Sequence, residues 1–255
     1  MAGSHVVNVD LLKFWDTQSG EDRQPVCTLS WGDDFDAEVT DSSVKAELLH
    51  FTRSKGQVTA RPMTGFAAAR TSDGKPLAVP RSQSDVLKVN YVDVQQGDAC
   101  VIETPKGTIA LMDGGDNQMF ARYLASRYRG TTREQPLDVA CIVVTHGDSD
   151  HLAGFTKILE SERETNAKKR LYIQPRRVYH NGLVRRPSKR PDAEAFGATV
   201  KRGGETIITG LESDLLAVDT AEMNENFAEW QATLKEYADR AKKNNQDPSE
   251  IRGRR

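Results

Sequence analysis

The chain has 255 residues, of which 37% are hydrophobic and 28% are charged, so its composition allows a packed core. A net charge of −2 at pH 7 gives no overall positive field that would attract a nucleic acid or a membrane surface. The sequence has neither a run of about 18 apolar residues nor a basic and apolar leader, so we expect a cytoplasmic protein without a membrane span. Three scattered cysteines fit a reducing compartment.

The first 75 residues are expected to form a small all-β domain. Between residues 6 and 70, polar and apolar residues alternate in short runs separated by Gly and Asp turns. The stretch LSWGDDFDAEV and the strands expected after it resemble SH3-like small barrels. This resemblance implies a module that binds a protein partner, while Trp15 and Trp31 are expected in its core. The Pro- and Ser-containing residues 76–85 are expected to form a linker.

The pattern changes at residue 86, where a second domain, residues 86–220, is expected. Strands are predicted at 86–94, 99–104, 108–115 and 139–146, and helices at 119–129 and 150–161. Strands followed by strand–helix units predict an α+β fold with helices on a sheet. The stretches ETIITG and DLLAVD are expected to be strands. Residues 221–255 are expected to form a last helix, at about 222–244, and a frayed polar tail.

A dense group of polar residues, VVTHGDSDHLAG, lies between the last strand of this series and the helix that follows it. His146, Asp148, Asp150 and His151 present imidazoles and carboxylates, the ligands that divalent cations take from proteins. Two pairs of ligands could serve two ions about 3.5–4 Å apart. The alternative is a polar loop in which Asp148 or Asp150 caps the helix. The spacing of two His and two Asp residues favours the metal site.

The same residues resemble a known signature. HxDxDH is similar to the HxHxDH motif of the metallo-β-lactamase fold, with Asp148 at the second position. The turn DVQQGD at 93–98 and the strand end DGG at 113–115 resemble the hydrolase domain of DNA-uptake competence proteins of the ComEC type. The resemblance covers residues 86–160 and implies an αββα sandwich, of which this chain contains the N-terminal half.

The resemblance also implies roles for individual residues. His146 and Asp148 would bind one metal ion, and Asp150 and His151 a second, with Asp150 as the catalytic residue that contacts the nucleophilic water. Asp113 and Asp98 would brace the ligands from behind, or else would be turn residues that bond their own backbone. Two zinc ions are expected, and the oxygen ligand Asp148 also admits manganese, iron or magnesium.

The family completes its site with ligands that this sequence does not clearly provide. They are a further histidine, a bridging aspartate and a final histidine. Of the five histidines, His180 alone follows His151, and it is a candidate ligand, a substrate contact or a surface residue. Asp214 and Asp219 are candidates for the bridging aspartate. The chain is therefore interpreted as a fragment of a longer enzyme, or as a degenerate domain.

A basic stretch at 163–202 surrounds His180. Its arginines could form a phosphate-binding rim beside the metal ions, or a solvated loop. The four arginines that flank His180 are Arg176, Arg177, Arg185 and Arg186. The resulting hypothesis is a hydrolase in which metal-bound hydroxide attacks a phosphodiester, with nucleic acid as a possible substrate. The alternatives are a hydrolase of a neutral ester, lactone or thioester, and a non-catalytic module that binds metal or a partner.

Overall fold

The computed structural model describes residues 3–188 and 195–253 and divides the chain into two compact units. The smaller unit comprises Met1–Lys88 and Thr104–Gly107, and the larger one comprises Val89–Glu103 and Thr108–Arg255. Residues 76–85, expected to be a linker, contain the short strand β7, which pairs with the first strand of the smaller unit. Lys189 and Arg190, part of the basic stretch, lie outside the described residues.

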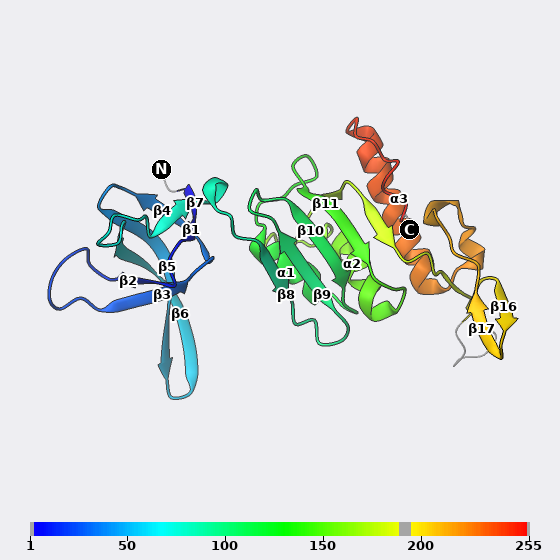
Figure 1. The fold of residues 1–255 in the computed structure, drawn as a ribbon, viewed down its shortest axis with the longest axis horizontal. Helices are drawn as coiled ribbons and strands as arrows, with labels where there is room; N and C mark the ends of the chain where they lie inside the picture. The colour runs from blue at the N-terminus through cyan, green and yellow to red at the C-terminus, as the bar shows by residue number, and fades with distance from the viewer. Residues whose placement is uncertain (1–2, 189–194, 254–255) are drawn as a thin grey trace. The chain divides into compact units, whose positions relative to one another are not determined.

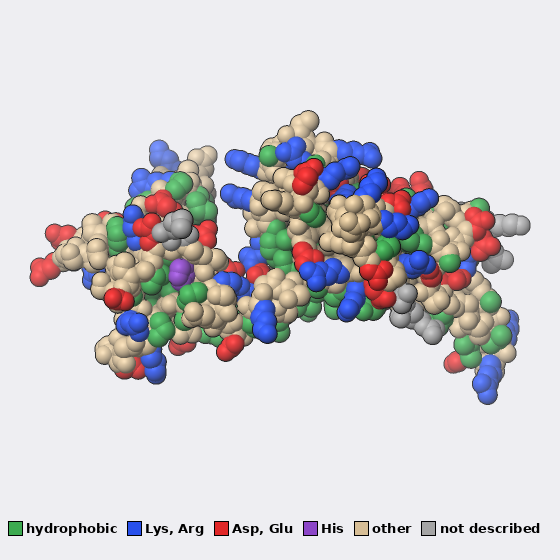
Figure 2. Space-filling model, turned by 90° about the horizontal axis from the view of Figure 1, so that it is seen from above, with side chains coloured by type: hydrophobic (Ala, Val, Ile, Leu, Met, Phe, Trp, Pro, Cys, Tyr) green, Lys and Arg blue, Asp and Glu red, His purple; other side chains and the backbone are tan. Residues whose placement is uncertain are grey.

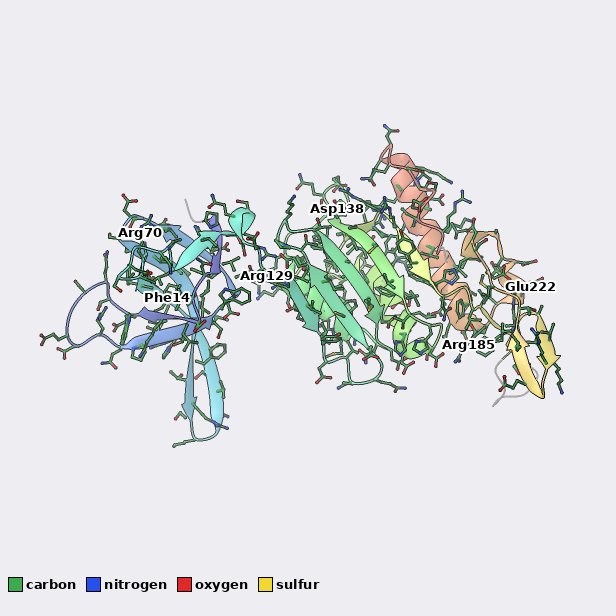
Figure 3. The ribbon with its side chains drawn as sticks, viewed as in Figure 1. Phe14, Arg70, Arg129, Asp138, Arg185 and Glu222 are labelled. Carbon is green, nitrogen blue, oxygen red and sulfur yellow. The ribbon has the colours of Figure 1, made fainter. Side chains whose placement is uncertain are left out.

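The smaller unit is one seven-stranded antiparallel sheet in the order β3-β2-β6-β5-β4-β1-β7. Its elements are β1 (Gly3–Val7), β2 (Leu11–Trp15), β3 (Pro25–Ser30), β4 (Asp34–Val39), β5 (Ser43–Ser54), β6 (Gln57–Ala68), β7 (Ala78–Pro80) and the 3-10 helix η1 (Arg81–Gln83). Burial alternates along β2 and β5, as the sequence pattern predicted, and Phe14 and Val44 lie fully buried in the core (Figure 3).

An SH3-like barrel is not confirmed, because the sheet is open. In the described residues, the edge strands β3 and β7 do not pair with each other, and β7 has only three residues with which to form a ladder. β2 and β6 are joined by the single pair Trp15 and Phe66. The prediction for Trp31 was wrong: it lies between β3 and β4 with 59% of its surface exposed.

The larger unit is built on a six-stranded sheet with the order β12-β11-β10-β9-β8, in which β13 also pairs with β11. Its first elements are β8 (Lys88–Tyr91), β9 (Ala99–Glu103), β10 (Ile109–Gly114), α1 (Met119–Arg127), β11 (Leu137–Val144), α2 (Ser149–Ser161), β12 (Ile173–Pro175) and β13 (Val178–His180). β10, β12 and β13 all run parallel to β11. Figure 1 shows α1 and α2 behind this sheet, where Phe120, Leu152 and Phe155 are completely buried.

The second half of the larger unit differs from the predicted strands. Its elements are the pair β14 (Arg185–Arg186) and β15 (Ala195–Phe196), the hairpin β16 (Thr199–Arg202) and β17 (Glu205–Ile208), the 3-10 helices η2 (Leu215–Ala217) and η3 (Thr220–Glu222), and α3 (Glu225–Lys243). ETIITG contains β17, as predicted. DLLAVD forms η2 instead of a strand, because the Asp214 carboxylate accepts the Leu216 N–H at 2.9 Å and caps a turn.

The tail beyond α3 is not frayed over its described residues. Ile251 is only 1% exposed, and the Val178 N–H donates to the Glu250 carbonyl at 3.0 Å. The prediction of a polar, frayed tail missed this apolar anchor.

The face of the large sheet opposite α1 and α2 carries partly exposed apolar side chains. They include Tyr91, 82% exposed, and Val89, 48% exposed. The described residues thus form one sheet and one main helix layer of the expected αββα arrangement. None of the helices in residues 3–188 and 195–253 has the length and apolar character that crossing a membrane requires.

Candidate metal centre

Parallel strands deliver the candidate ligands to one edge of the large sheet. β11 ends at Val144, two residues before His146, and α2 begins at Ser149. Met112 near the end of β10 pairs with Val143, and His180 at the end of β13 pairs with Val144. The carboxyl ends of three strands therefore meet at the HGDSDH motif, as is usual for functional loops in such sheets.

The capping alternative for Asp148 is not what the structure shows. Asp148 occupies the N-cap position of α2 with an extended backbone, yet its side chain makes no capping hydrogen bond. Its backbone carbonyl accepts the N–H of His151 at 3.0 Å instead. The carboxylate is thus available for another partner.

Asp113 orders the motif from behind. Its side chain is 3% exposed and accepts three hydrogen bonds: from Thr145 N at 2.8 Å, from Thr145 Oγ1 at 2.6 Å and from His151 Nδ1 at 3.0 Å. Asp113 adopts a positive φ of 52°, which is costly for a residue with a side chain. The alternative of a turn aspartate that bonds its own backbone does not describe these contacts.

The same hydrogen bonds decide which nitrogen of each histidine carries a proton. Thr145 has one hydroxyl proton, and the 2.6 Å contact places it toward Asp113. His146 Nδ1, 3.1 Å from the Thr145 oxygen, must then donate. His151 Nδ1 also donates, since the Asp113 carboxylate can only accept. Both rings therefore use Nδ1 as a donor within the protein, which leaves Nε2 as the nitrogen that could bind a metal ion.

The four candidate ligands form two neighbouring pairs. His146 Nε2 lies 3.8 Å from Asp148 Oδ2, His151 Nε2 lies 4.0 Å from Asp150 Oδ1, and the two imidazole centroids are 3.8 Å apart. Two ligands that share one divalent ion, each about 2.1 Å from it, lie at most about 4 Å apart, so each pair is at the upper limit of this spacing. The donor types, with both Nε2 atoms outside the Nδ1 hydrogen bonds, fit a metal ion. Across residues 3–188 and 195–253, no three His, Cys, Asp or Glu side chains converge closely enough to hold one.

Arg185 explains part of this incomplete convergence. Its guanidinium donates from Nη2 to Asp148 Oδ1 in a short ion pair, and it lies over the Phe196 ring with 5.9 Å between the guanidinium carbon and the ring centroid. The Arg185 side chain is 22% exposed. The Asp148 carboxylate is therefore already paired with a positive charge from the protein, that of Arg185.

The other predicted arginines lie elsewhere. Arg176 pairs with Asp138 near the start of β11, and Figure 3 shows Asp138 and Arg185 far apart along the larger unit. The Arg177 carbonyl accepts the Ile142 N–H in the middle of β11. Arg186 is neutralised by Glu212 at 2.6 Å and Glu222 at 2.7 Å. The structure thus brings Arg185 to the motif but neither Arg176 nor Arg186.

Figure 2 shows Lys and Arg side chains over much of the visible face of the larger unit. The Lys and Arg side chains in that view are interspersed with Asp and Glu.

His180 is close to the motif in the sheet but has a different environment. It is 7% exposed, and burial lowers its pKa to about 4, although the Gly253 backbone and Asp214 act in the opposite direction. Its Nδ1 accepts the Gly182 N–H at 2.9 Å, so the proton of the neutral ring is on Nε2. His180 Nδ1 thus accepts, whereas the Nδ1 atoms of His146 and His151 donate, and His180 does not join their pairs.

Neither candidate for a bridging aspartate contacts the motif. Asp214 caps η2 and accepts from Arg252 Nη1 at 2.9 Å. Asp219 caps η3 by accepting the Ala221 N–H at 2.9 Å. Both carboxylates are used in local turns.

The QQGD turn supports the motif through its backbone. A Cβ placed on Gly97 would lie 1.7 Å from the Asp150 carbonyl oxygen, so the two backbones are in direct contact. Asp98 is exposed, and its carbonyl accepts the Gly115 N–H at 2.9 Å. The sequence analysis did not predict that Thr145 bonds Asp113 and His146, or that Gly97 lies against the Asp150 backbone. The hydroxyl next to His146 was the signal that could have indicated the first of these contacts.

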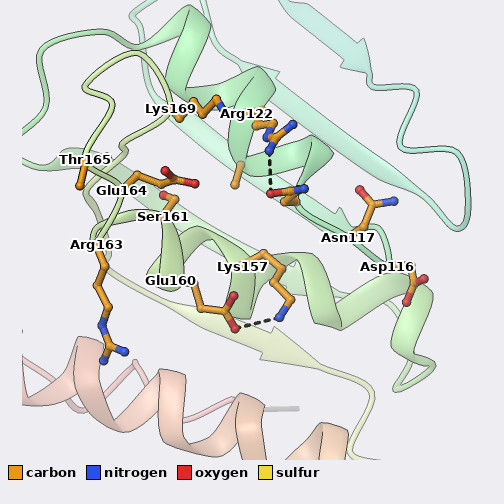
Figure 4. A pocket seen from close by; sticks show the side chains of 12 residues that line it. Asp116, Asn117, Arg122, Lys157, Glu160, Ser161, Arg163, Glu164, Thr165 and Lys169 are labelled. Atoms are coloured by element: carbon orange, nitrogen blue, oxygen red, sulfur yellow. Dashed lines mark hydrogen bonds and ion pairs between the residues drawn. The ribbon is translucent and has the colours of Figure 1, made fainter.

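A separate cavity of about 570 Å³ lies on the helix layer, between α1 and the end of α2 (Figure 4). Its charges are mixed: Lys157 pairs with Glu160 at 2.8 Å, and Arg122 donates to Gln118 at 2.9 Å. None of the four candidate metal ligands lines this cavity.

A comparison with protein families found one match, the metallo-beta-lactamase superfamily, over residues 92–219. The matched range contains the DGG turn, the HGDSDH motif, the parallel strands and His180. Searches of the curated proteins and of the solved structures each found no match. Since the family match covers half of the chain and includes the HGDSDH motif, this chain belongs to the metallo-beta-lactamase superfamily.

Proposed function

We propose that this protein hydrolyses a phosphodiester, as a relative of the ComEC-type hydrolase domains, with nucleic acid as the substrate class. Family membership indicates a metal-dependent hydrolase without specifying its substrate. The observation that carries the proposal is the contact of Arg185 with Asp148, because it places a guanidinium on the carboxylate that lies 3.8 Å from His146 Nε2. A guanidinium binds phosphate oxygens as a two-pronged donor.

In this proposal, His146 with Asp148 and His151 with Asp150 hold two divalent cations, with zinc as the first candidate and manganese or iron as alternatives. When bound, the cations acidify water and polarise the phosphoryl centre. Asp113 and Thr145 keep both imidazoles oriented. Asp150 accepts a proton from the attacking water, and Arg185 leaves Asp148 to bind the non-bridging phosphate oxygens.

The proposal is tested by metal analysis and by hydrolysis of bis-p-nitrophenyl phosphate. We expect close to two metal ions per chain, falling by at least one in His151→Ala and unchanged in the control His5→Ala, which lies in the other unit. Arg185→Gln should reduce kcat/KM for the phosphodiester at least about 10-fold without loss of metal, because it removes a charged hydrogen bond of about 1.5–3 kcal/mol.

Arg176→Gln is the matched control, since Arg176 is also paired with an aspartate but lies near the other end of β11. Equal activities of the two arginine variants would contradict the phosphodiester assignment. Less than half a metal ion per chain, unchanged in His151→Ala, would instead identify a non-catalytic module.

A neutral ester, lactone or thioester is the second candidate substrate. It is favoured by the pairing of Arg176 and Arg186 with carboxylates, which leaves Arg185 as the only one of these three arginines at the motif. This function predicts turnover of p-nitrophenyl acetate that Arg185→Gln does not change.

A further inference from the structure

The hairpin of β5 and β6 extends beyond the rest of the sheet in the smaller unit (Figure 1). Inside the sheet, Val44 and Leu48 are buried, whereas every residue from 51 to 62 is exposed. Lys55 and Gly56 make the turn with φ angles of 47° and 80°, the two positive values of a type I′ hairpin. Residues 49–62, here named the β5–β6 arm, thus form a two-stranded ribbon that solvent reaches from both faces.

The β5–β6 arm differs in charge from the chain as a whole. It contains Arg53, Lys55 and Arg61 and no Asp or Glu, while the chain has 35 Lys and Arg against 37 Asp and Glu. Among the described residues, no carboxylate forms an ion pair with these three cations. The arm therefore presents unneutralised positive charge, which a polyanion complements.

The strand register distributes these cations around the ribbon. Arg53 pairs with Val58, so both lie on one face, and Arg61 pairs with His50 on the other. Lys55 lies at the tip. The face of Arg53 also carries exposed apolar side chains: Leu49 is 53%, Phe51 is 63% and Val58 is 61% exposed.

We propose that the β5–β6 arm inserts into a groove of double-stranded DNA. The major groove of B-form DNA is about 12 Å wide and admits a two-stranded ribbon. Phosphates line both walls of a groove, which matches cations on both faces and at the tip. A flat acidic protein surface, by contrast, would contact one face of the arm, so that either Arg53 or Arg61 would remain without a partner.

The remaining side chains of the arm suit the same partner. Phe51 and Val58 can contact thymine methyl groups, and the polar face offers Thr52, Gln57 and Thr59 as hydrogen-bonding groups for base edges or phosphates. The deep and narrow major groove of A-form RNA excludes a ribbon of this width. This proposal does not rest on the proposed hydrolase function, because it concerns binding alone.

The experiment measures binding of the full-length protein to a fluorescein-labelled DNA duplex by anisotropy, with EDTA present so that no turnover occurs. The test variant combines Arg53→Gln, Lys55→Gln and Arg61→Gln, all at exposed positions where folding should be unaffected. We expect Kd to rise at least about 10-fold and the slope of log Kd against log salt to fall by about 2 to 3, one unit for each lost phosphate contact. Phe51→Ser should weaken binding without changing that slope.

The matched control removes three exposed cations outside the basic stretch, by Lys106→Gln, Lys235→Gln and Lys243→Gln. Equal effects of the arm variant and the control on affinity would overturn the proposal, since net charge alone would then explain the binding. Equal affinity for duplex RNA would also overturn it. So would an arm variant that changes only self-association, measured by light scattering, and leaves DNA binding intact.

Discussion

Asp113 has a strained backbone and accepts three hydrogen bonds. The donors, Thr145 and His151, lie 32 and 38 residues further along the chain, in and next to the HGDSDH motif. A positive φ in a residue with a side chain costs on the order of 1–3 kcal/mol and persists only where the surroundings hold it. Here Thr145 and His151 hold it. The strain is thus located where it orients two imidazole rings.

Replacing Asp113 with Asn should weaken metal binding about 10- to 100-fold, because an amide cannot accept from both Thr145 and His151 as a carboxylate does. Titration calorimetry with zinc measures this loss. Asp41→Asn, an exposed substitution in the smaller unit, is the control. Unchanged zinc affinity in a folded Asp113→Asn protein would show that the hydrogen bonds of Asp113 to Thr145 and His151 do not orient the metal ligands.

His180 should make the stability of the larger unit depend on pH. Burial lowers its folded pKa to about 4, below the ordinary value of 6.5 that is expected in the unfolded chain. The unfolded state therefore binds more protons between these values, so stability is complete above pH 6.5 and is lost as pH falls toward 4. The loss is on the order of 3 kcal/mol.

Urea unfolding in the presence of EDTA measures this dependence. The unfolding free energy of wild type should decrease more steeply than that of His180→Gln between pH 7 and pH 4.5. Parallel curves for the two proteins would contradict the assigned burial of a neutral imidazole.

At the scale of elements, the position of α3 depends on one buried ion pair and on aromatic packing. Arg240 of α3 donates from Nη2 to the Glu162 carboxylate just after α2 at 2.8 Å, and the side chains are 7% and 6% exposed. Arg240 Nη1 also donates to the Ile173 carbonyl of β12 at 3.1 Å. Trp230 packs on Phe155 with ring centroids 5.5 Å apart. These contacts connect α2, α3 and the sheet.

Arg240→Leu should destabilise the larger unit by about 3–5 kcal/mol, because it leaves the Glu162 carboxylate buried without its partner. Burial already raises the pKa of Glu162, and Arg240 opposes that effect. The double variant Arg240→Leu with Glu162→Leu should recover most of the stability. A double-mutant cycle from urea unfolding measures the coupling, and additive losses would contradict it.

At the scale of the whole molecule, the residues that the structure describes form two separate apolar cores. The smaller unit is centred on Phe14 and Val44, and the larger one on Leu111, Phe155 and Trp230. No residue belongs to both clusters. Each core can therefore melt as its own cooperative unit.

Calorimetry should show two unfolding transitions. Saturating zinc should raise only the transition of the larger unit, because a ligand stabilises the part of a protein that binds it, by about 2.7 kcal/mol at 100 times Kd. The shift should disappear in His151→Ala. A single transition that zinc moves as a whole would contradict two independent cores.

The sequence by itself determined most of the local elements and predicted the chemistry of the motif. Alternating burial in β2 and β5, the apolar strand β11 and the helical spacing of α2 follow from short-range periodicity, which depends only on neighbouring residues. HxDxDH predicted a metal-binding loop after β11 because side-chain type and spacing are properties of the chain alone.

The tertiary structure decided what those residues contact. Asp113 reaches Thr145, Arg185 reaches Asp148, and Arg176 lies near the opposite end of β11, although Arg176 and Arg185 are close in sequence. Such contacts depend on strand order and register, which join distant segments and leave no periodic signal. The open edge of the smaller sheet and the buried Ile251 were decided in the same way, because a strand partner or a core position is a property of the assembled fold.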